Sequence, residues 1–147
     1  MAHDPNDVWA DMTIKVWPER YWLVDLDSTH TPAALAAMTA STGRYCCTIR
    51  DQTGFSFVLD DKTWRSIEPN VVARQKFGPL KVISTDSPLP FDVVGFIQAA
   101  LRKVNGAGHK AAPQCGAAAD HFFTGEQDIE TVESLFNQLI AEAKAKR

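Results

Sequence analysis

The pattern of apolar and polar positions is clearest over residues 78–104, where a strand pattern changes into a helix pattern. Val82 and Ile83 belong to an apolar, β-branched run, and Pro88 and Pro90 then interrupt the extended pattern. Apolar residues next recur at three- and four-residue spacing, as expected for one face of a helix: Val93, Ile97, Ala100, Leu101 and Val104. A strand, a short loop and an amphipathic helix are therefore predicted, and such a junction can hold a small polar ligand.

An earlier part of the chain has the same order of elements. Residues 21–27 are aromatic and β-branched and predict a strand that ends in Asp-Ser. Thr31 and Pro32 are typical of a helix start, and the Ala-rich stretch after them predicts a helix to about residue 40. Residues 44–59 predict a β-hairpin, which is followed by a short helix.

The strand at residues 80–86 begins a second series of this kind. It also ends in Asp-Ser, and its amphipathic helix is followed by a weaker hairpin at residues 109–124. Residues 127–147 have the strongest helical pattern, with acidic residues in the first turn and lysines in the last. This internal similarity predicts two copies of one βαββα unit.

A βαββα unit completed by one more strand forms a ferredoxin-like sheet with its helices on one face. Residues 71–73 can supply the last strand of the first copy, and the strand at 13–17 is expected to complete the second. The predicted fold class is therefore α+β, with two ferredoxin-like βαββαβ modules side by side in an antiparallel sheet. The predicted divisions are a flexible N-terminal arm at 1–12, a first module at 13–76 and a second module at 77–147.

The sequence resembles the ACT-domain superfamily, and in its tandem form it is similar to CASTOR-type ACT proteins. Four stretches carry the resemblance: ERYWLVDLDS, TGFSFVLDD, FGPLKVISTDSPLPFDVVGFIQAALRKVNGAGH and AAADHFFTGEQDIETVESLFNQL. The last is the most informative, because in this group a second hairpin with an acidic residue at its turn leads into a hydrophobic strand and an acidic, amphipathic helix.

The resemblance implies a regulatory protein that binds an amino acid or a similar small molecule between its two modules, at the strand-to-helix loops. The family's ligand-contacting places match the following residues of this chain: Thr85, Asp86, Ser87, Phe91, Val94 and Asp120. A carboxylate such as Asp86 or Asp120 can pair with a ligand amine, while loop N–H groups and the Ser87 hydroxyl can hold its carboxylate. Exposed sheet edges of such modules often pair, which allows a homodimer.

Composition and charge narrow the function classes. A net charge of −3 with scattered basic residues gives no footprint for nucleic acid. No apolar run approaches the length of a membrane span, and the first residues lack the form of a signal peptide, so a cytoplasmic or nuclear location is expected. The histidines and cysteines lack metal-ligand spacing, and no glycine pattern fits a phosphate. Neither a metal nor a cofactor is therefore expected.

A small metabolite-processing enzyme is the alternative, for example an isomerase, a cyclase or a lyase that uses the same crevice. His109 and His121 are its candidate catalytic residues, together with Asp86 and Asp120. Asp120 and His121 are neighbours on a strand and point to opposite faces, so they form one dyad only across a bulge. If the hairpin turns at Ala117-Ala118, Cys115 pairs with Asp120, which raises the pKa of the thiol. A purely interacting subunit that has lost its pocket is the third possibility.

Overall fold

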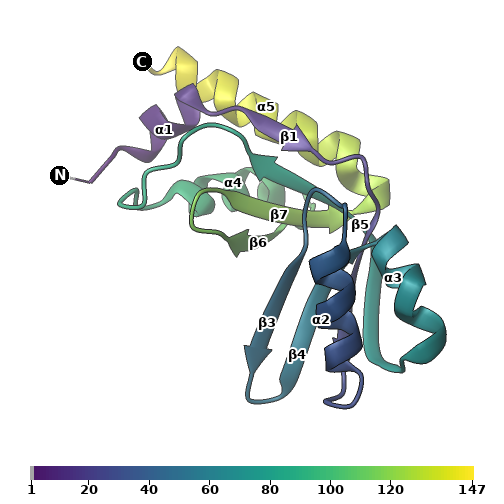
Figure 1. Cartoon of the computed structure of the whole chain (residues 1–147). Helices are drawn as coiled ribbons and strands as arrows, with labels where there is room; N and C mark the ends of the chain where they lie inside the picture. Colours follow the sequence, from purple (N-terminus) through teal and green to yellow (C-terminus); the bar gives the residue numbers. More distant parts are fainter. Residues whose placement is uncertain (1) are drawn as a thin grey trace. The chain divides into compact units, whose positions relative to one another are not determined.

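Figure 1 shows the computed structural model of the chain, in which residues 2–147 are described. The fold is mixed α+β, with antiparallel strand pairs and five α-helices in the described residues. Contacts between residues divide the chain into two compact units. Unit 2 is the continuous segment Trp17–Lys81, and unit 1 combines Val82–Arg147 with the chain up to Val16.

Unit 2 is built from strands and two short helices. Its elements are β2 (Tyr21–Leu26), α2 (Thr31–Ala40), β3 (Cys47–Asp51), β4 (Gly54–Asp60), α3 (Asp61–Ile67), the 3₁₀ turn η1 (Glu68–Asn70) and the first part of β5 (Ala73–Thr85). The strands lie in the order β3-β4-β2-β5, and each neighbouring pair is antiparallel.

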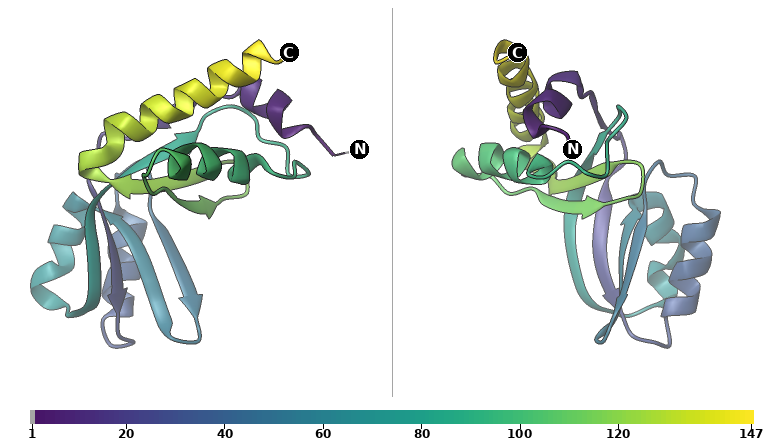
Figure 2. Two further views of the ribbon diagram at one scale, coloured as in Figure 1. Left: turned by 180° about the vertical axis from the view of Figure 1, so that it is seen from behind. Right: turned by 90° about the vertical axis from the view of Figure 1, so that its left-hand side faces the viewer.

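One face of these strands and the helices α2 and α3 enclose the core of unit 2. Trp22 lies opposite Leu59 and Val24 lies opposite Phe57 in the β2–β4 register, so alternate residues point to this face. The helices add further buried residues to the same cluster: Ala34, Trp64 and Ile67. In the right-hand view of Figure 2, both helices of unit 2 lie on one side of its strands.

Unit 1 uses elements from both ends of the chain. They are α1 (Pro5–Asp11), β1 (Ile14–Val16), the last part of β5, α4 (Phe96–Gly106), β6 (Ala112–Cys115), β7 (Asp120–Gly125), the 3₁₀ turn η2 (Glu126–Asp128) and α5 (Ile129–Ala145). The strands follow the order β6-β7-β5, and β1 pairs antiparallel with the other edge of β5, where Val16 is opposite Ile83. In unit 1 the hairpin β6–β7 therefore lies next to β5, whose other edge pairs with β1. In unit 2 the hairpin β3–β4 lies next to β2, whose other edge pairs with β5.

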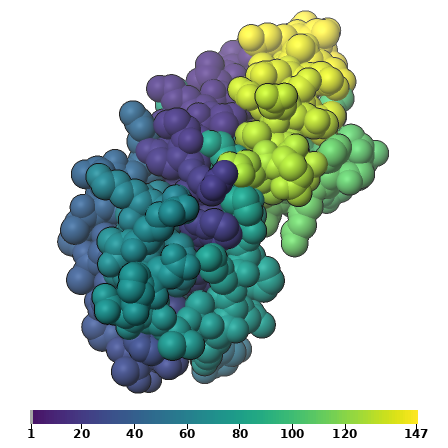
Figure 3. Space-filling model, turned by 90° about the vertical axis from the view of Figure 1, so that its right-hand side faces the viewer, coloured from purple at the N-terminus to yellow at the C-terminus, as the bar shows by residue number. Residues whose placement is uncertain are grey.

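Aromatic rings join the helices of unit 1 to its strands. Trp9 of α1 stacks on Phe96 of α4 with ring centroids 4.2 Å apart, and Phe136 of α5 meets Trp9 edge-on at 5.8 Å. Phe136 also contacts the ring of Phe122 of β7 at 4.9 Å. Ile83 of β5 is fully buried in the same cluster. Figure 3 shows α5, in yellow, packed against the N-terminal segment in purple.

The N-terminal segment differs from the flexible arm predicted at residues 1–12, because it contains the helix α1. The Asp4 side chain caps this helix by accepting a hydrogen bond from the backbone N–H of Asn6, at 2.7 Å. Trp9 is buried and donates its Nε1–H to the carbonyl of Phe96, at 2.9 Å. The contacts that stabilise α1 are made with residues far away in the sequence. Residues 1–12 are a short, polar stretch with one tryptophan, so they show no extended helical repeat of apolar positions.

The segment at residues 71–86 also differs from the prediction. In place of a small strand at 71–73 and a separate strand at 80–86, the single strand β5 extends from Ala73 to Thr85. Its first part pairs with β2, where Tyr21 is opposite Leu80, and its last part pairs with β1, where Ile14 is opposite Thr85. One continuous strand therefore takes the place of the two predicted strands.

None of the helices in the described part of the chain is long and apolar enough to span a membrane.

Replacing Trp9 by alanine tests whether α1 is part of the core of unit 1. We expect Trp9→Ala to lower the free energy of unfolding by about 3–5 kcal/mol, because a buried stacked ring and its hydrogen bond are lost. Phe91→Ala is the matched control, since that ring is fully exposed and its loss should change the stability by less than about 0.5 kcal/mol. Urea unfolding measures both changes, and equal effects of the two variants would contradict a structural role for α1.

Candidate functional site

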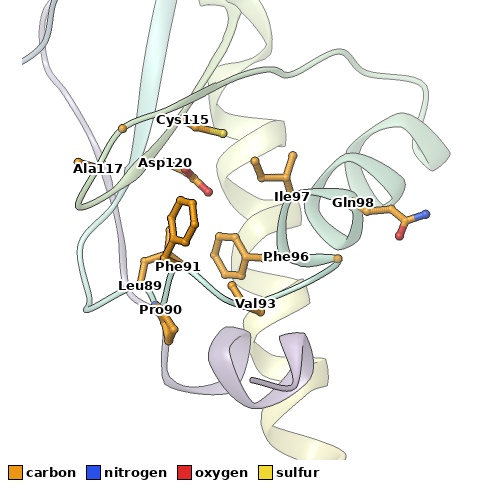
Figure 4. Close-up of a pocket in the computed structure, with 12 residues that line it drawn as sticks. Leu89, Pro90, Phe91, Val93, Phe96, Ile97, Gln98, Cys115, Ala117 and Asp120 are labelled. Carbon is orange, nitrogen blue, oxygen red and sulfur yellow. The ribbon is translucent and has the colours of Figure 1, made fainter. Parts of the chain in front are cut away.

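A pocket of about 380 Å³ lies in unit 1, between the loop that follows β5, the first turn of α4 and the β6–β7 turn (Figure 4). The loop and helix residues that line it are Leu89, Pro90, Phe91, Val93, Gly95, Phe96, Ile97 and Gln98. The hairpin residues that line it are Cys115, Gly116, Ala117 and Asp120. Most of this wall is apolar, which is typical of sites for small organic ligands.

The β6–β7 hairpin places Asp120 at the pocket. Cys115 and Asp120 are direct partners in its register, and the backbone N–H of Gly116 donates to the carbonyl of Ala119 at 2.9 Å. A side chain at Gly116 would have its Cβ 2.8 Å from that carbonyl oxygen, so this tight turn requires a glycine. The pairing matches the one predicted for a turn at Ala117-Ala118.

Asp120 is the only charged side chain among the residues that line the pocket, and it is 7% exposed. Its backbone N–H donates to Thr85 Oγ1 at 3.0 Å, which fixes the strand beside the end of β5. Figure 4 shows its carboxylate directed toward the rings of Phe91 and Phe96. Burial raises the pKa of Asp120, and a hydrogen bond with Cys115 and the nearby His121 only partly oppose this rise.

Cys115 is exposed and lies at the same wall. Partial loss of water around the sulfur, followed by the charge of Asp120, raises the pKa of its thiol. The raised pKa keeps Cys115 in its neutral form, which is a poor nucleophile. The hairpin therefore brings one carboxylate and one neutral thiol to the pocket.

The helix α4 brings the opposite polarity to the pocket. Gly95 precedes it in a left-handed conformation, with φ of 91°, and no side chain caps the first turn. The first residues of α4, Phe96 to Gln98, line the pocket. Because the first N–H groups of a helix have no partner within it, this end of α4 carries a partial positive charge. A carboxylate and a helix N-terminus thus line one cavity.

The predicted ligand-binding residues divide into two groups in the structure. Phe91 and Asp120 line the pocket, and Thr85 Oγ1 accepts the backbone N–H of Asp120. Asp86 and Ser87 instead bind the start of β1. The backbone N–H of Asp86 donates to the carbonyl of Thr13 at 2.8 Å, and Ser87 Oγ accepts the N–H of Thr13 at 2.9 Å.

The remaining predicted positions lie outside the residues that line the pocket. The carboxylate of Asp86 pairs with Lys15 at 3.4 Å, and the side chain of Val94 is 78% exposed. His109 lies 3.5 Å from the carboxylate of Asp128. His121 Nδ1 is 2.6 Å from Ser84 Oγ, and burial lowers the pKa of this histidine. Neither histidine lines the pocket with Asp120.

No cluster for a metal ion accompanies the pocket. Within residues 2–147, no group of three or more His, Cys, Asp or Glu side chains is arranged to hold one. A second cavity, of about 250 Å³, lies in unit 2 near Ser41 and Thr63. Both hydroxyls already hydrogen-bond the buried Asp60, so that carboxylate has its partners within the protein.

Several pocket residues were missed from the sequence. The sequence pattern places Leu89, Val93 and the first turn of α4 in a loop or on a helix face, and their approach to the hairpin depends on the folded chain. Cys115 did have a usable signal, since its pairing with Asp120 follows from the hairpin turn. Gly95 is a second signal, because a glycine directly before a helix permits a left-handed entry.

Comparison with known proteins finds similarity in structure alone. No protein-family model matches the sequence, and no curated protein matches it. A solved protein of unknown function from Vibrio cholerae, described as a possible transport protein, has a TM-score of 0.65 and 15% identity and covers 90% of this chain and 92% of its own.

Aspartate kinases are also among the similar structures. The allosteric aspartate kinase of Clostridium acetobutylicum has a TM-score of 0.66 at 8% identity, over 86% of this chain and 34% of the kinase. The ligand-free regulatory subunit of the Thermus thermophilus aspartate kinase has a TM-score of 0.61 at 9% identity, over 87% of this chain and 98% of its own. At such identities the likeness concerns the fold alone, and that fold is ACT-like.

The burial of the Asp120 carboxylate should lower the stability of the protein. Since burial raises the pKa of Asp120 above its ordinary value of 3.8, ionisation disfavours the folded state as pH rises from that value through the raised pKa. We expect Asp120→Asn to be more stable than the wild type at pH 7, by about 0.5–1 kcal/mol, with the gain lost below pH ~4.

Asp11→Asn is the control of opposite sign, because a hydrogen bond from Arg147 lowers the pKa of Asp11. That variant should be less stable at pH 7, and its loss should shrink as pH falls through the lowered pKa. Thermal unfolding over a range of pH measures both variants. A pH-independent effect at Asp120 would contradict the account of its burial.

The thiol of Cys115 reports on the same carboxylate. Asp120→Asn removes the negative charge that raises the thiol pKa, so Cys115 should be alkylated severalfold faster near neutral pH. Cys46 and Cys47 in unit 2 provide internal controls and should react at unchanged rates. Peptide-level mass spectrometry after brief iodoacetamide treatment measures all three. An unchanged rate at Cys115 would show that the charge of Asp120 does not affect the reactivity of this thiol.

Proposed function

We propose that this chain is an ACT-type regulatory protein that binds an amino acid in the pocket at Asp120. The observation that carries the proposal is that a buried carboxylate from β7 and the N-terminus of α4, which have opposite polarity, line the same cavity. A free amino acid has the complementary pair of charges, an ammonium and a carboxylate, on one carbon atom.

The ammonium group would be held by Asp120. A carboxylate that is 7% exposed is destabilised by the loss of water, and a cation beside it restores the lost solvation. Charge-assisted hydrogen bonds of this kind are stronger than bonds between neutral groups. Ligand binding therefore turns an unfavourable buried charge into a favourable ion pair.

The carboxylate of the ligand would be held by the start of α4. This helix has 11 residues, and its first residues line the pocket without a side-chain cap. Backbone N–H groups at such a helix end bind anions well. Gly95 adds no side chain of its own at this end, where Pro5 Cγ and Gln98 Oε1 lie 3.7 Å and 3.9 Å from the position that a Cβ of residue 95 would take.

The apolar walls of the pocket link ligand binding to the arrangement of the loop that follows β5. Phe91 is 102% exposed although it lines the pocket, so a ligand seated there would cover part of its ring. A ligand that contacts one arrangement of the loop better than others increases its population. The structural neighbours include a regulatory subunit and an allosteric kinase, and E. coli aspartokinase III was solved with aspartate and ADP. A regulatory role for this fold is consistent with those neighbours.

The finer features predicted from the sequence belong to the same proposal. They are a tandem, CASTOR-type arrangement of two ferredoxin-like modules and pairing of two copies through exposed sheet edges. The enzyme alternative needs an acid and a base that converge on one point. In the described structure the pocket has a single carboxylate, and His109 and His121 lie outside its lining, which favours binding over catalysis.

A thermal-shift screen of the common amino acids tests the proposal. At 100 times its dissociation constant, a ligand should stabilise the wild type by roughly 2.7 kcal/mol. Asp120→Ala should abolish this gain, because the ammonium loses its partner. Asp86→Ala removes an exposed carboxylate outside the pocket and should retain the full gain. If no amino acid stabilises the wild type, the proposed function is wrong.

A further inference from the structure

The charges around the pocket restrict which amino acid it can take. Asp120 is the only charged residue that lines the pocket, and the ammonium group of the ligand would use it. The remaining polar side chains there are the Gln98 amide and the Cys115 thiol, both neutral. A charged side chain on the ligand would therefore meet no opposite charge within the lining.

Basic groups near the same loop are already paired. Lys15 lies 3.4 Å from the carboxylate of Asp86, and His3 lies 2.7 Å from that of Asp92. A ligand with an acidic side chain would have to break one of these pairs or leave its own charge without a partner. Burying an unpaired charge is strongly unfavourable, so neither acidic nor basic side chains fit.

The apolar surface of the pocket supplies the attraction in place of charge. Leu89, Phe91, Val93, Phe96 and Ile97 present aliphatic and aromatic groups to the cavity. The ring of Phe91 is fully exposed, so an apolar ligand can remove it from water. Such burial strengthens binding in proportion to the apolar area that is covered.

We infer that the ligand is an α-amino acid with an uncharged, apolar side chain, of the size of leucine, methionine or phenylalanine. This inference rests on the proposed function and adds the class of ligand to it. Leucine should bind roughly tenfold or more tightly than alanine, because its larger side chain buries more apolar area. Aspartate and lysine should bind more weakly than either.

Two pairs of ligands of similar size separate shape from charge. Leucine and aspartate are both branched at the γ carbon, and methionine and lysine have similar lengths. Calorimetric titration of the wild type should detect leucine and methionine, with aspartate and lysine at least tenfold weaker. If aspartate or lysine binds as tightly as its apolar partner, the inference fails and the proposed function remains. If no amino acid binds, the proposed function fails with it.

Protection of Cys115 locates the binding site. Leucine at saturation should slow the alkylation of Cys115, which lines the pocket, and should leave Cys46 and Cys47 unaffected. Binding of leucine without protection of Cys115 would show that leucine binds outside this pocket, and it would overturn the inference.

A single added charge should change the preference. Gln98 is exposed at the pocket, so Gln98→Lys introduces a cation there without disturbing the core. This variant should gain at least tenfold in affinity for aspartate relative to leucine. Gln138→Lys places the same change on an exposed position of α5, outside the pocket, and should keep the preference of the wild type. An unchanged preference in Gln98→Lys would contradict the absence of a cation as the cause of specificity.

Discussion

The strand β5 is the element on which the rest of the structure depends. Its first residues pair with β2 in unit 2, and its last residues pair with β1 and neighbour β7 in unit 1. Thr85 at its end receives the backbone N–H of Asp120, which sets the hairpin beside the strand. The loop that leaves β5 then supplies one wall of the pocket, so the register of a single strand determines where both walls meet.

Elements with strong local patterns could be predicted from the sequence. The long helix over residues 127–147 was expected from its periodic face, and α5 covers Ile129–Ala145. The hairpin at residues 44–59 follows its turn residues in the same way, with β3 and β4 joined after Asp51. The helix α1 has a local start signal in Asp4 and Pro5, but its packing could not be predicted, because Trp9 is buried by Phe96 and Phe136, which come much later in the chain.

The candidate site was predictable only where it rests on local geometry or on the family resemblance. The resemblance indicated Phe91 and Asp120, and the hairpin turn placed Cys115 opposite Asp120. Asp86 and Ser87 are polar residues at a strand end, which can bind either a ligand or the chain itself. In the structure both residues hydrogen-bond to Thr13, which is far away in the sequence. No local sequence pattern indicates this contact.

The division of unit 1 between the two ends of the chain has a consequence for folding during synthesis. Trp17–Lys81 is continuous, so every residue of unit 2 has been made before most of unit 1 exists. The segment before Trp17 must wait for α4 and α5, since Trp9 packs against Phe96 and Phe136. Domains generally fold as units while the ribosome extends the chain. The core of unit 1 therefore forms late, when α4 and α5 meet the earlier segment that contains Trp9.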